Sequence, residues 1–268
     1  MTVSPETRPP YLLSPVTGRL GVGVAVTGDP GVVVVEVAPH GPWSEELGEQ
    51  MTAALSMCLA GPFPSIIVDL HDLGDPDGAS LPFWLALWRQ ARIGSTPVHA
   101  TFCLPPTTAL SRRLRSLPGP QPRVYAGVRE ARTANAERIA HADRLQVRLE
   151  PRPASVKAAR ALVAQACHAW NRPELLQDTW LIVSELAANA VEHAHTDFIV
   201  TVARSDARVH LAVHDCLSRF PAPRDPEPTS PPASLDDRGR GLRLVHTIAE
   251  AWGTVPTRDG KVVWATLR

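Results

Sequence analysis

Residues 181–195, with the sequence LIVSELAANAVEHAH, constrain the fold of this chain more than any other segment. The segment has no glycine or proline, and Glu185, Asn189 and His193 recur in it at every fourth position. At 3.6 residues per turn these polar side chains fall on one face of a helix. An acid, an amide and an imidazole are costly to place beside a buried face unless they meet a ligand or a partner. The pattern therefore predicts a helix that carries a binding site, whereas an isolated Glu185 would indicate only a solvated helix face.

A second signal follows about fifty residues downstream, in the sequence RGRGLRLVHTIAEAWG of residues 238–253. Gly239 and Gly241 open a segment with helical apolar periodicity. The two segments together predict a site for a magnesium nucleotide.

The overall composition limits the class of protein. A chain of 268 residues can form two modest domains. Its net charge of zero gives no support to a nucleic acid or an anionic membrane as the main partner. The first ten residues lack the apolar core of a signal peptide, no apolar run is long enough to span a bilayer, and the four cysteines are isolated, as expected for free thiols. These features predict a cytoplasmic protein.

The chain divides into four parts: a disordered tail over residues 1–15, a first domain over 16–136, a linker over 137–143 and a second domain over 144–268. In the first domain, apolar strands alternate with helical patterns, which predicts an α/β domain with a largely parallel sheet. The expected strands are 22–26, 32–37, 65–70, 98–104 and 123–125, and the expected helices are 42–59, 80–93, 107–117 and 128–140.

The second domain has a different pattern, with helices placed over a mainly antiparallel sheet. This order predicts an α/β sandwich. The proline-rich residues 219–238 cannot form a regular element and are expected to be a mobile loop. The expected strands are 144–149, 198–203, 209–214 and 261–267, and the expected helices are 153–170, 175–193 and 242–251.

Four motifs in order make residues 144–268 resemble the ATP-binding domain of the GHKL superfamily, a Bergerat-type α/β sandwich, in the branch of the anti-sigma-factor serine kinases. The asparagine box is SELAANAVEH, and the segment VHDCLS contains the aspartate of a first glycine box. The second glycine box is RGRGLRLV, and the closing strand is GKVVWATL.

The resemblance implies ATP and Mg²⁺ as ligands and a role for each motif residue. Asn189 would ligate Mg²⁺, Glu185 would act as the catalytic base, and His193 would support the site. Asp215 would accept a hydrogen bond from the adenine amino group, and the 219–238 loop would be the ATP lid. The residues implied at the phosphates are Arg238, Gly239, Arg240, Gly241 and Leu242.

Some of these positions have other interpretations. Asp215 is followed by Cys216, Leu217 and Ser218, where the superfamily usually has glycines. Arg240 would alternatively be an ordinary charge on a helix surface. Lys261 resembles a family position but would alternatively be a turn residue.

Residues 16–136 resemble a STAS domain, the fold of anti-anti-sigma factors, through VVVVEV, IIVDLHDLGDPDG and PVHATFCLP. The family has an Asp-Ser-Ser-Gly tetrad with a phosphorylated serine. Here the tetrad reads Asp75-Pro76-Asp77-Gly78, so Asp77 stands at the phosphoserine position. Asp77 has three interpretations. Its charge would mimic the phosphoserine permanently, or its domain would serve only for docking or dimerisation, or its side chain would cap a helix.

The two resemblances together predict a bacterial regulator that controls a sigma factor by partner switching. A serine/threonine kinase domain would transfer a phosphoryl group from ATP to a serine of a separate STAS-domain protein. The expected partners are that protein and a sigma factor, without direct contact to nucleic acid or membrane, and kinases of this branch imply a homodimer. The alternative is a catalytically weak ATP-sensing module that sequesters its partner.

Asp77→Ser tests the tetrad assignment. We expect the substitution to make the first domain a substrate for a kinase of the anti-sigma class, because it restores a hydroxyl at the phosphoacceptor position. Intact mass after incubation with the kinase and ATP should show one added phosphate on the variant and none on the wild-type chain. An unmodified Asp77→Ser protein would contradict the assignment.

Overall fold

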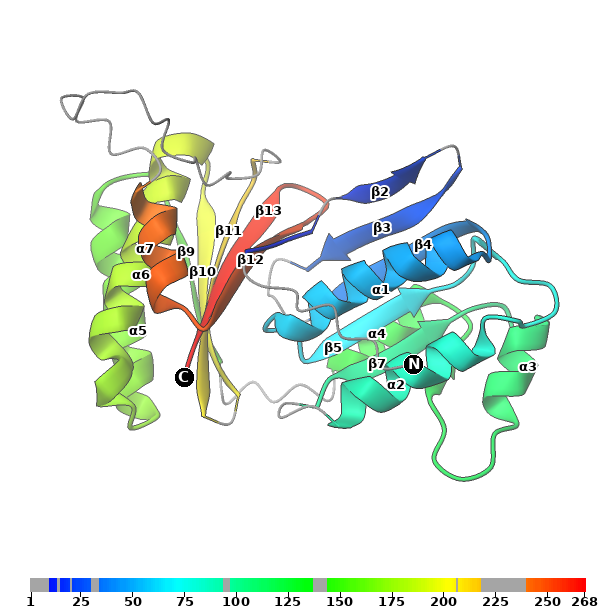
Figure 1. The fold of residues 1–268 in the computed structure, drawn as a ribbon. Helices are drawn as coiled ribbons and strands as arrows, with labels where there is room; N and C mark the ends of the chain where they lie inside the picture. Colours follow the sequence, from blue (N-terminus) through cyan, green and yellow to red (C-terminus); the bar gives the residue numbers. More distant parts are fainter. Residues whose placement is uncertain are drawn as a thin grey trace.

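Two β-sheets, each covered by helices, organise the chain in the computed structural model (Figure 1). The structure describes residues 10–13, 15–19, 21–29, 34–93, 97–136, 144–205, 207–217 and 240–268. The α/β fold class predicted for both halves is confirmed. Within these ranges, no helix combines the length and apolar character needed to cross a membrane.

The N-terminal domain is built on a sheet in the order β2-β3-β4-β5-β7-β8, with β6 paired to β4. Its strands β4, β5, β7 and β8 are parallel, and helices connect them. The strands are β2 (Val16–Arg19), β3 (Val22–Gly28), β4 (Val34–Pro42), β5 (Ser65–Asp69), β6 (Leu73–Gly74), β7 (His99–Cys103) and β8 (Arg123–Tyr125). The helices are α1 (Glu45–Ala60), α2 (Leu81–Ile93), α3 (Ala109–Arg115) and α4 (Val128–Ala136).

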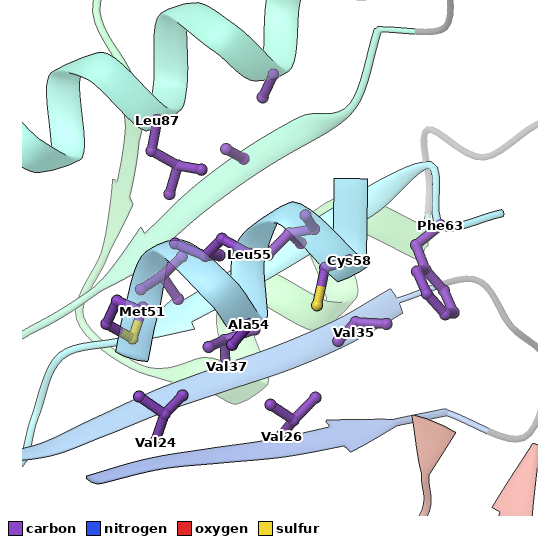
Figure 2. Close-up of a cluster of buried hydrophobic side chains, with 14 of the residues drawn as sticks. Val24, Val26, Val35, Val37, Met51, Ala54, Leu55, Cys58, Phe63 and Leu87 are labelled. Atoms are coloured by element: carbon purple, nitrogen blue, oxygen red, sulfur yellow. The ribbon is translucent and has the colours of Figure 1, made fainter. Parts of the chain in front are cut away.

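Helix α1 shows why these elements form where they do. Its N-cap is Ser44, whose hydroxyl accepts a hydrogen bond from the Leu47 amide at 3.2 Å. Its buried side chains recur at helical spacing and pack on β3 and β4 (Figure 2). Among them are Met51, Leu55 and Cys58. The apolar row seen in the sequence therefore becomes one layer of the core.

The C-terminal domain is built on a six-stranded sheet in the order β1-β12-β13-β11-β10-β9. All neighbouring strands from β12 to β9 are antiparallel, and the helices cover one face (Figure 1). The strands are β1 (Tyr11–Leu12), β9 (Arg144–Leu149), β10 (Phe198–Ser205), β11 (Arg208–Asp215), β12 (Ala251–Pro256) and β13 (Lys261–Leu267), and the α-helices are α5 (Ala154–Ala169), α6 (Leu176–Asn189) and α7 (Arg240–Ile248).

Two sequence-based expectations are wrong. Helix α7 ends at Ile248, and the predicted helical residue Ala251 instead begins β12. Part of the predicted disordered tail is ordered, because Tyr11 and Leu12 form β1 parallel to β12. Hydrogen bonding to the sheet edge explains this order, and the Leu13 amide continues it with a 3.1 Å bond to the carbonyl of Thr254. Residues 1–9, the predicted linker 137–143 and the proline-rich loop 219–238 lie outside the described residues.

The two domains share one hydrophobic core. On the face of the C-terminal sheet opposite its helices, Trp264 is fully buried. Its ring is stacked with that of Tyr11, with centroids 6.0 Å apart, and meets the edge of Phe63 at 6.1 Å. A Cβ at Gly28 in β3 would lie 3.0 Å from a methyl group of Val255 in β12. The N-terminal domain therefore covers the outer face of the C-terminal sheet directly.

Trp264→Ala tests this shared core. We expect it to lower the free energy of unfolding of the whole chain by about 3–5 kcal/mol, because it leaves a cavity between the domains. Chemical denaturation followed by circular dichroism measures the change. The control is Trp180→Ala, since Trp180 is 42% exposed and donates one hydrogen bond. This variant should lose about 1 kcal/mol of unfolding free energy or less. An equal loss of unfolding free energy in the two variants would contradict the shared core.

Candidate functional site

Glu185 and Asn189 lie on the last two turns of α6. The helix begins after a 3-10 turn at Pro173–Leu175 and is held by buried side chains at helical spacing. Ile182 and Leu186 are among these buried residues, whereas Glu185 and Asn189 are half-buried. The predicted placement of an acid and an amide one turn apart, at the border of the packed face, is confirmed.

The helix changes its winding directly after Asn189. Residues Ala190–Ala194 form a π-helical turn, and His195 ends it with a left-handed φ of 53°. His193 is exposed, unlike Glu185 and Asn189. Turns of π-helix inside α-helices are often found at functional sites. The regular helical spacing of the sequence gave no sign of this change.

Helix α7 starts against the carboxylate of Glu185. A Cβ placed on Gly241 would lie only 2.3 Å from Oε2 and 3.2 Å from Cδ of Glu185. A side chain larger than hydrogen at position 241 would therefore displace the carboxylate or the helix. The fold thus brings together the asparagine-box acid and the second glycine box, two motifs far apart in the sequence.

The other residues predicted at the phosphates have different positions. Leu242 is a core residue, 6% exposed, so only its backbone could face a ligand. Arg240 is the first residue of α7, and its side chain lies outside the description. Arg238 and Gly239 also lie outside the described residues.

Asp215 ends β11 and forms a buried ion pair with Lys261, the first residue of β13. Lys261 Nζ donates to Asp215 Oδ1 at 2.7 Å and to the carbonyl of Leu217 at 3.0 Å. The Leu217 amide donates to the same Oδ1 at 2.9 Å. Asp215 and Lys261 are 4% and 5% exposed. Lys261 is therefore a strand residue with a buried charge, and its interpretation as a turn residue is wrong.

The sequence pattern did not reveal this pair. The antiparallel register of β11 and β13 places Asp215 directly opposite Lys261, and such a register cannot be read from either segment alone. Gly260 is part of the same arrangement, because a Cβ there would lie 1.9 Å from the carbonyl oxygen of Asp215. The Gly-Lys sequence thus lets the two strands close around the carboxylate.

Strand alternation places this pair on the helix side of the sheet. Val209, Leu211 and Val213 pack into the core beneath the helices, and Asp215 continues their alternation. Lys261 is in register with Asp215 and shares that side. The candidate site thus consists of the end of α6, the start of α7 and the adjoining ends of β11 and β13.

Within the described ranges, no cluster of three or more His, Cys, Asp or Glu side chains is arranged to hold a metal ion. An amide oxygen such as that of Asn189 still suits Mg²⁺, which takes most of its remaining ligands from water and substrate phosphates. The four cysteines are free thiols, as predicted.

In the predicted tetrad, residues 75–78, the carboxylate of Asp75, and not that of Asp77, organises the start of α2. Asp75 accepts hydrogen bonds from the amides of Ala79 at 2.7 Å and Ser80 at 3.1 Å. The Ser80 hydroxyl also donates to Asp75 and accepts from Trp84 Nε1 at 2.7 Å. The interpretation of Asp77 as the cap is therefore wrong, and its side chain is exposed.

The contact between Glu185 and Gly241 can be tested by a double-mutant cycle. Alanine is favoured over glycine in a helix by about 1 kcal/mol. We expect Gly241→Ala to stabilise the Glu185→Ala variant more than the wild-type chain, because only the wild type has a carboxylate that must move. Unfolding free energies give the coupling. Gly127→Ala, at a glycine with open space around it, should show no coupling to Glu185→Ala, and additivity at Gly241 would contradict the contact.

Comparison with known proteins identifies the C-terminal half. The model of the histidine kinase-like ATPase domain family matches residues 149–267. No curated protein matches the chain.

Two solved structures are distantly similar. One contains the RsbU and RsbW domains of Rv1364c from Mycobacterium tuberculosis, with 17% identity, coverage of 47% of this chain and 32% of that chain, and a TM-score of 0.36. The other is an anti-sigma factor antagonist from Mycobacterium paratuberculosis. The match has 18% identity and a TM-score of 0.32, and it covers 48% of this chain and 99% of that chain. This chain thus spans about a third of the first structure. The family model thus matches the part of the chain in which the sequence motifs predicted an ATP-binding domain.

Proposed function

We propose that the C-terminal domain binds Mg·ATP at the ends of α6, α7, β11 and β13 and transfers its γ-phosphoryl group to a serine of a separate STAS-domain protein. In this way the protein would control a sigma factor by partner switching. The observation that carries the proposal is the contact between Glu185 and Gly241, since it joins an acid to the phosphate-binding segment of an ATPase domain.

Four residues of the proposed site would each have one role in this reaction. The Asp215 carboxylate accepts a hydrogen bond from the adenine amino group, and the backbone at Gly241 approaches the phosphates. Asn189 would hold Mg²⁺, which would supply positive charge next to the phosphates. Glu185 takes the proton of the serine hydroxyl as the new O–P bond forms and the bond between the γ-phosphorus and the ADP oxygen breaks. Positioning and charge stabilisation supply most of the rate.

The phosphoryl acceptor would be another protein and not the chain's own tetrad. The tetrad has aspartate and proline in place of serines. Its Gly78 packs against Leu110 and Arg113 of α3, and Figure 1 shows α3 at the end of the N-terminal domain farthest from the C-terminal sheet. The chemistry and the distance both favour an acceptor outside the chain.

A second candidate is an ATP-sensing module that sequesters a sigma factor or a STAS partner without turnover. The features that favour it are the residues Cys216-Leu217-Ser218 after Asp215, where the superfamily usually has glycines, and the tetrad without serines. ATP binding without phosphoryl transfer would distinguish this candidate from the kinase.

Calorimetric titration of Mg·ATP into the full chain tests the nucleotide site. Asn189→Ala should weaken magnesium-dependent binding about 10-fold or more, since it removes a charge-assisted contact. Gln177→Ala, which truncates an exposed amide on the first turn of the same helix, should bind as the wild type does. Absence of binding by the folded wild-type chain would contradict both candidate functions.

A phosphotransfer assay with γ-labelled ATP and a serine-bearing STAS protein separates the two candidates. The kinase predicts label on the partner, and Glu185→Gln should lower the transfer rate about 100-fold or more while ATP binding persists, because only the base is lost. Binding without label in the wild type would favour the sensor. Undiminished transfer by Glu185→Gln would remove Glu185 as the base.

A further inference from the structure

The buried ion pair leaves the two oxygens of Asp215 in different situations. Lys261 Nζ and the Leu217 amide both donate to Oδ1, at 2.7 and 2.9 Å. Lys261 is held in turn by the carbonyl of Leu217 at 3.0 Å. Two donors that converge on one oxygen fix the plane of the carboxylate. Among the described contacts of Asp215, none ends on Oδ2, so this is the oxygen to which a ligand could donate.

A buried lysine at this position lowers the stability of the fold unless its charge interacts with a partner. Its ammonium is buried beside a buried carboxylate, and taking both charges out of water costs free energy that their attraction must offset. The two donors that meet Oδ1 set the orientation of this carboxylate, whose oxygens are hydrogen-bond acceptors. The pair therefore presents an oriented acceptor on the helix side of the sheet.

Such an acceptor distinguishes between purine bases. The 6-amino group of adenine is a donor and pairs with a carboxylate, whereas the 6-oxo group of guanine is an acceptor and does not. Groups left without a partner at a buried polar site are strongly rejected. Selectivity for a 6-aminopurine then depends on the charge and the orientation of Asp215.

We infer that Lys261 is a positioning residue that makes Asp215 selective for the 6-amino group of an adenine nucleotide. This inference rests on the proposed nucleotide site. Lys261 acts through Asp215: it holds Oδ1 and leaves Oδ2 to the base. If Lys261 only tied β13 to the Asp215–Leu217 segment, its loss would weaken the binding of all nucleotides equally.

The test compares two ligands that differ only at the inferred contact. Calorimetry on the full chain measures the affinities for Mg·ATP and for purine riboside 5′-triphosphate, which lacks the 6-amino group. The wild type should prefer ATP by about 10-fold or more, the size expected of one hydrogen bond to a charged group. In Lys261→Met this ratio should fall towards one, while the affinity for the purine riboside triphosphate changes little.

The chain supplies a matched control, because Lys157 is its only other lysine and lies exposed on α5. Lys157→Met should keep the wild-type ratio. Lys261→Arg keeps a cation next to Asp215 and should restore part of the selectivity. If Lys261→Met does not fold, Lys261→Gln replaces it, since glutamine retains an N–H donor without the charge, and its ratio should also fall.

The outcomes separate this inference from the function on which it rests. A folded Lys261→Met or Lys261→Gln chain that keeps the wild-type ratio would overturn the role of Lys261 and leave the nucleotide site intact. A wild type that binds both triphosphates equally would overturn it as well. A wild type that binds neither would remove the proposed nucleotide function itself.

Discussion

Strand β13 connects the two halves of this protein, because all seven of its residues are buried. Val263, Ala265 and Leu267 point into the core beneath the helices of the C-terminal domain. Val262 and Trp264 point the other way, into the core shared with the N-terminal domain. A strand with two apolar faces requires cover on both sides. The helices provide one cover, and the N-terminal domain provides the other.

The candidate site depends on the same strand. Lys261 begins β13 on the helix side, and its neighbour Val262 already belongs to the shared core. Loss of the N-terminal domain would expose the outer face of the strand that positions Asp215. Nucleotide binding is therefore a property to measure on the full chain, and a fragment that begins at residue 144 would lack half of the packing around β13.

The loop at residues 75–80 of the N-terminal domain is ordered by side-chain hydrogen bonds at both of its ends. Asp75 holds the start of α2 through the amides of Ala79 and Ser80, and Arg113 holds the loop by donating to the carbonyl of Gly78 at 2.9 Å. Asp77 is left exposed, which fits either a permanent negative charge at the phosphoserine position or a surface used for docking. These two interpretations predict the same structure and differ in what a serine at position 77 would do.

Most of the regular structure was predictable from the sequence, because it depends on local periodicity. The row of Leu47, Met51 and Leu55 defines α1, and the apolar residues 65–70 define β5. The position of Glu185 one helical turn before Asn189 follows from helical spacing, and the second glycine box marks the start of α7. The strands β1, β2, β6 and β12 escaped prediction. β1 has only two residues, and β1 and β12 depend on pairing with each other and with β13.

The sequence alone thus determined most of the segments that become helices and strands and which residue types are available for a nucleotide site. Only the tertiary structure decided that Asp215 lies opposite Lys261, that Glu185 meets Gly241 and that Tyr11 stacks on Trp264. Periodicity reports which face of an element is apolar, since that is a local property of the chain. Strand register and helix packing bring together residues that are distant in the sequence, and the patterns within single segments do not encode them.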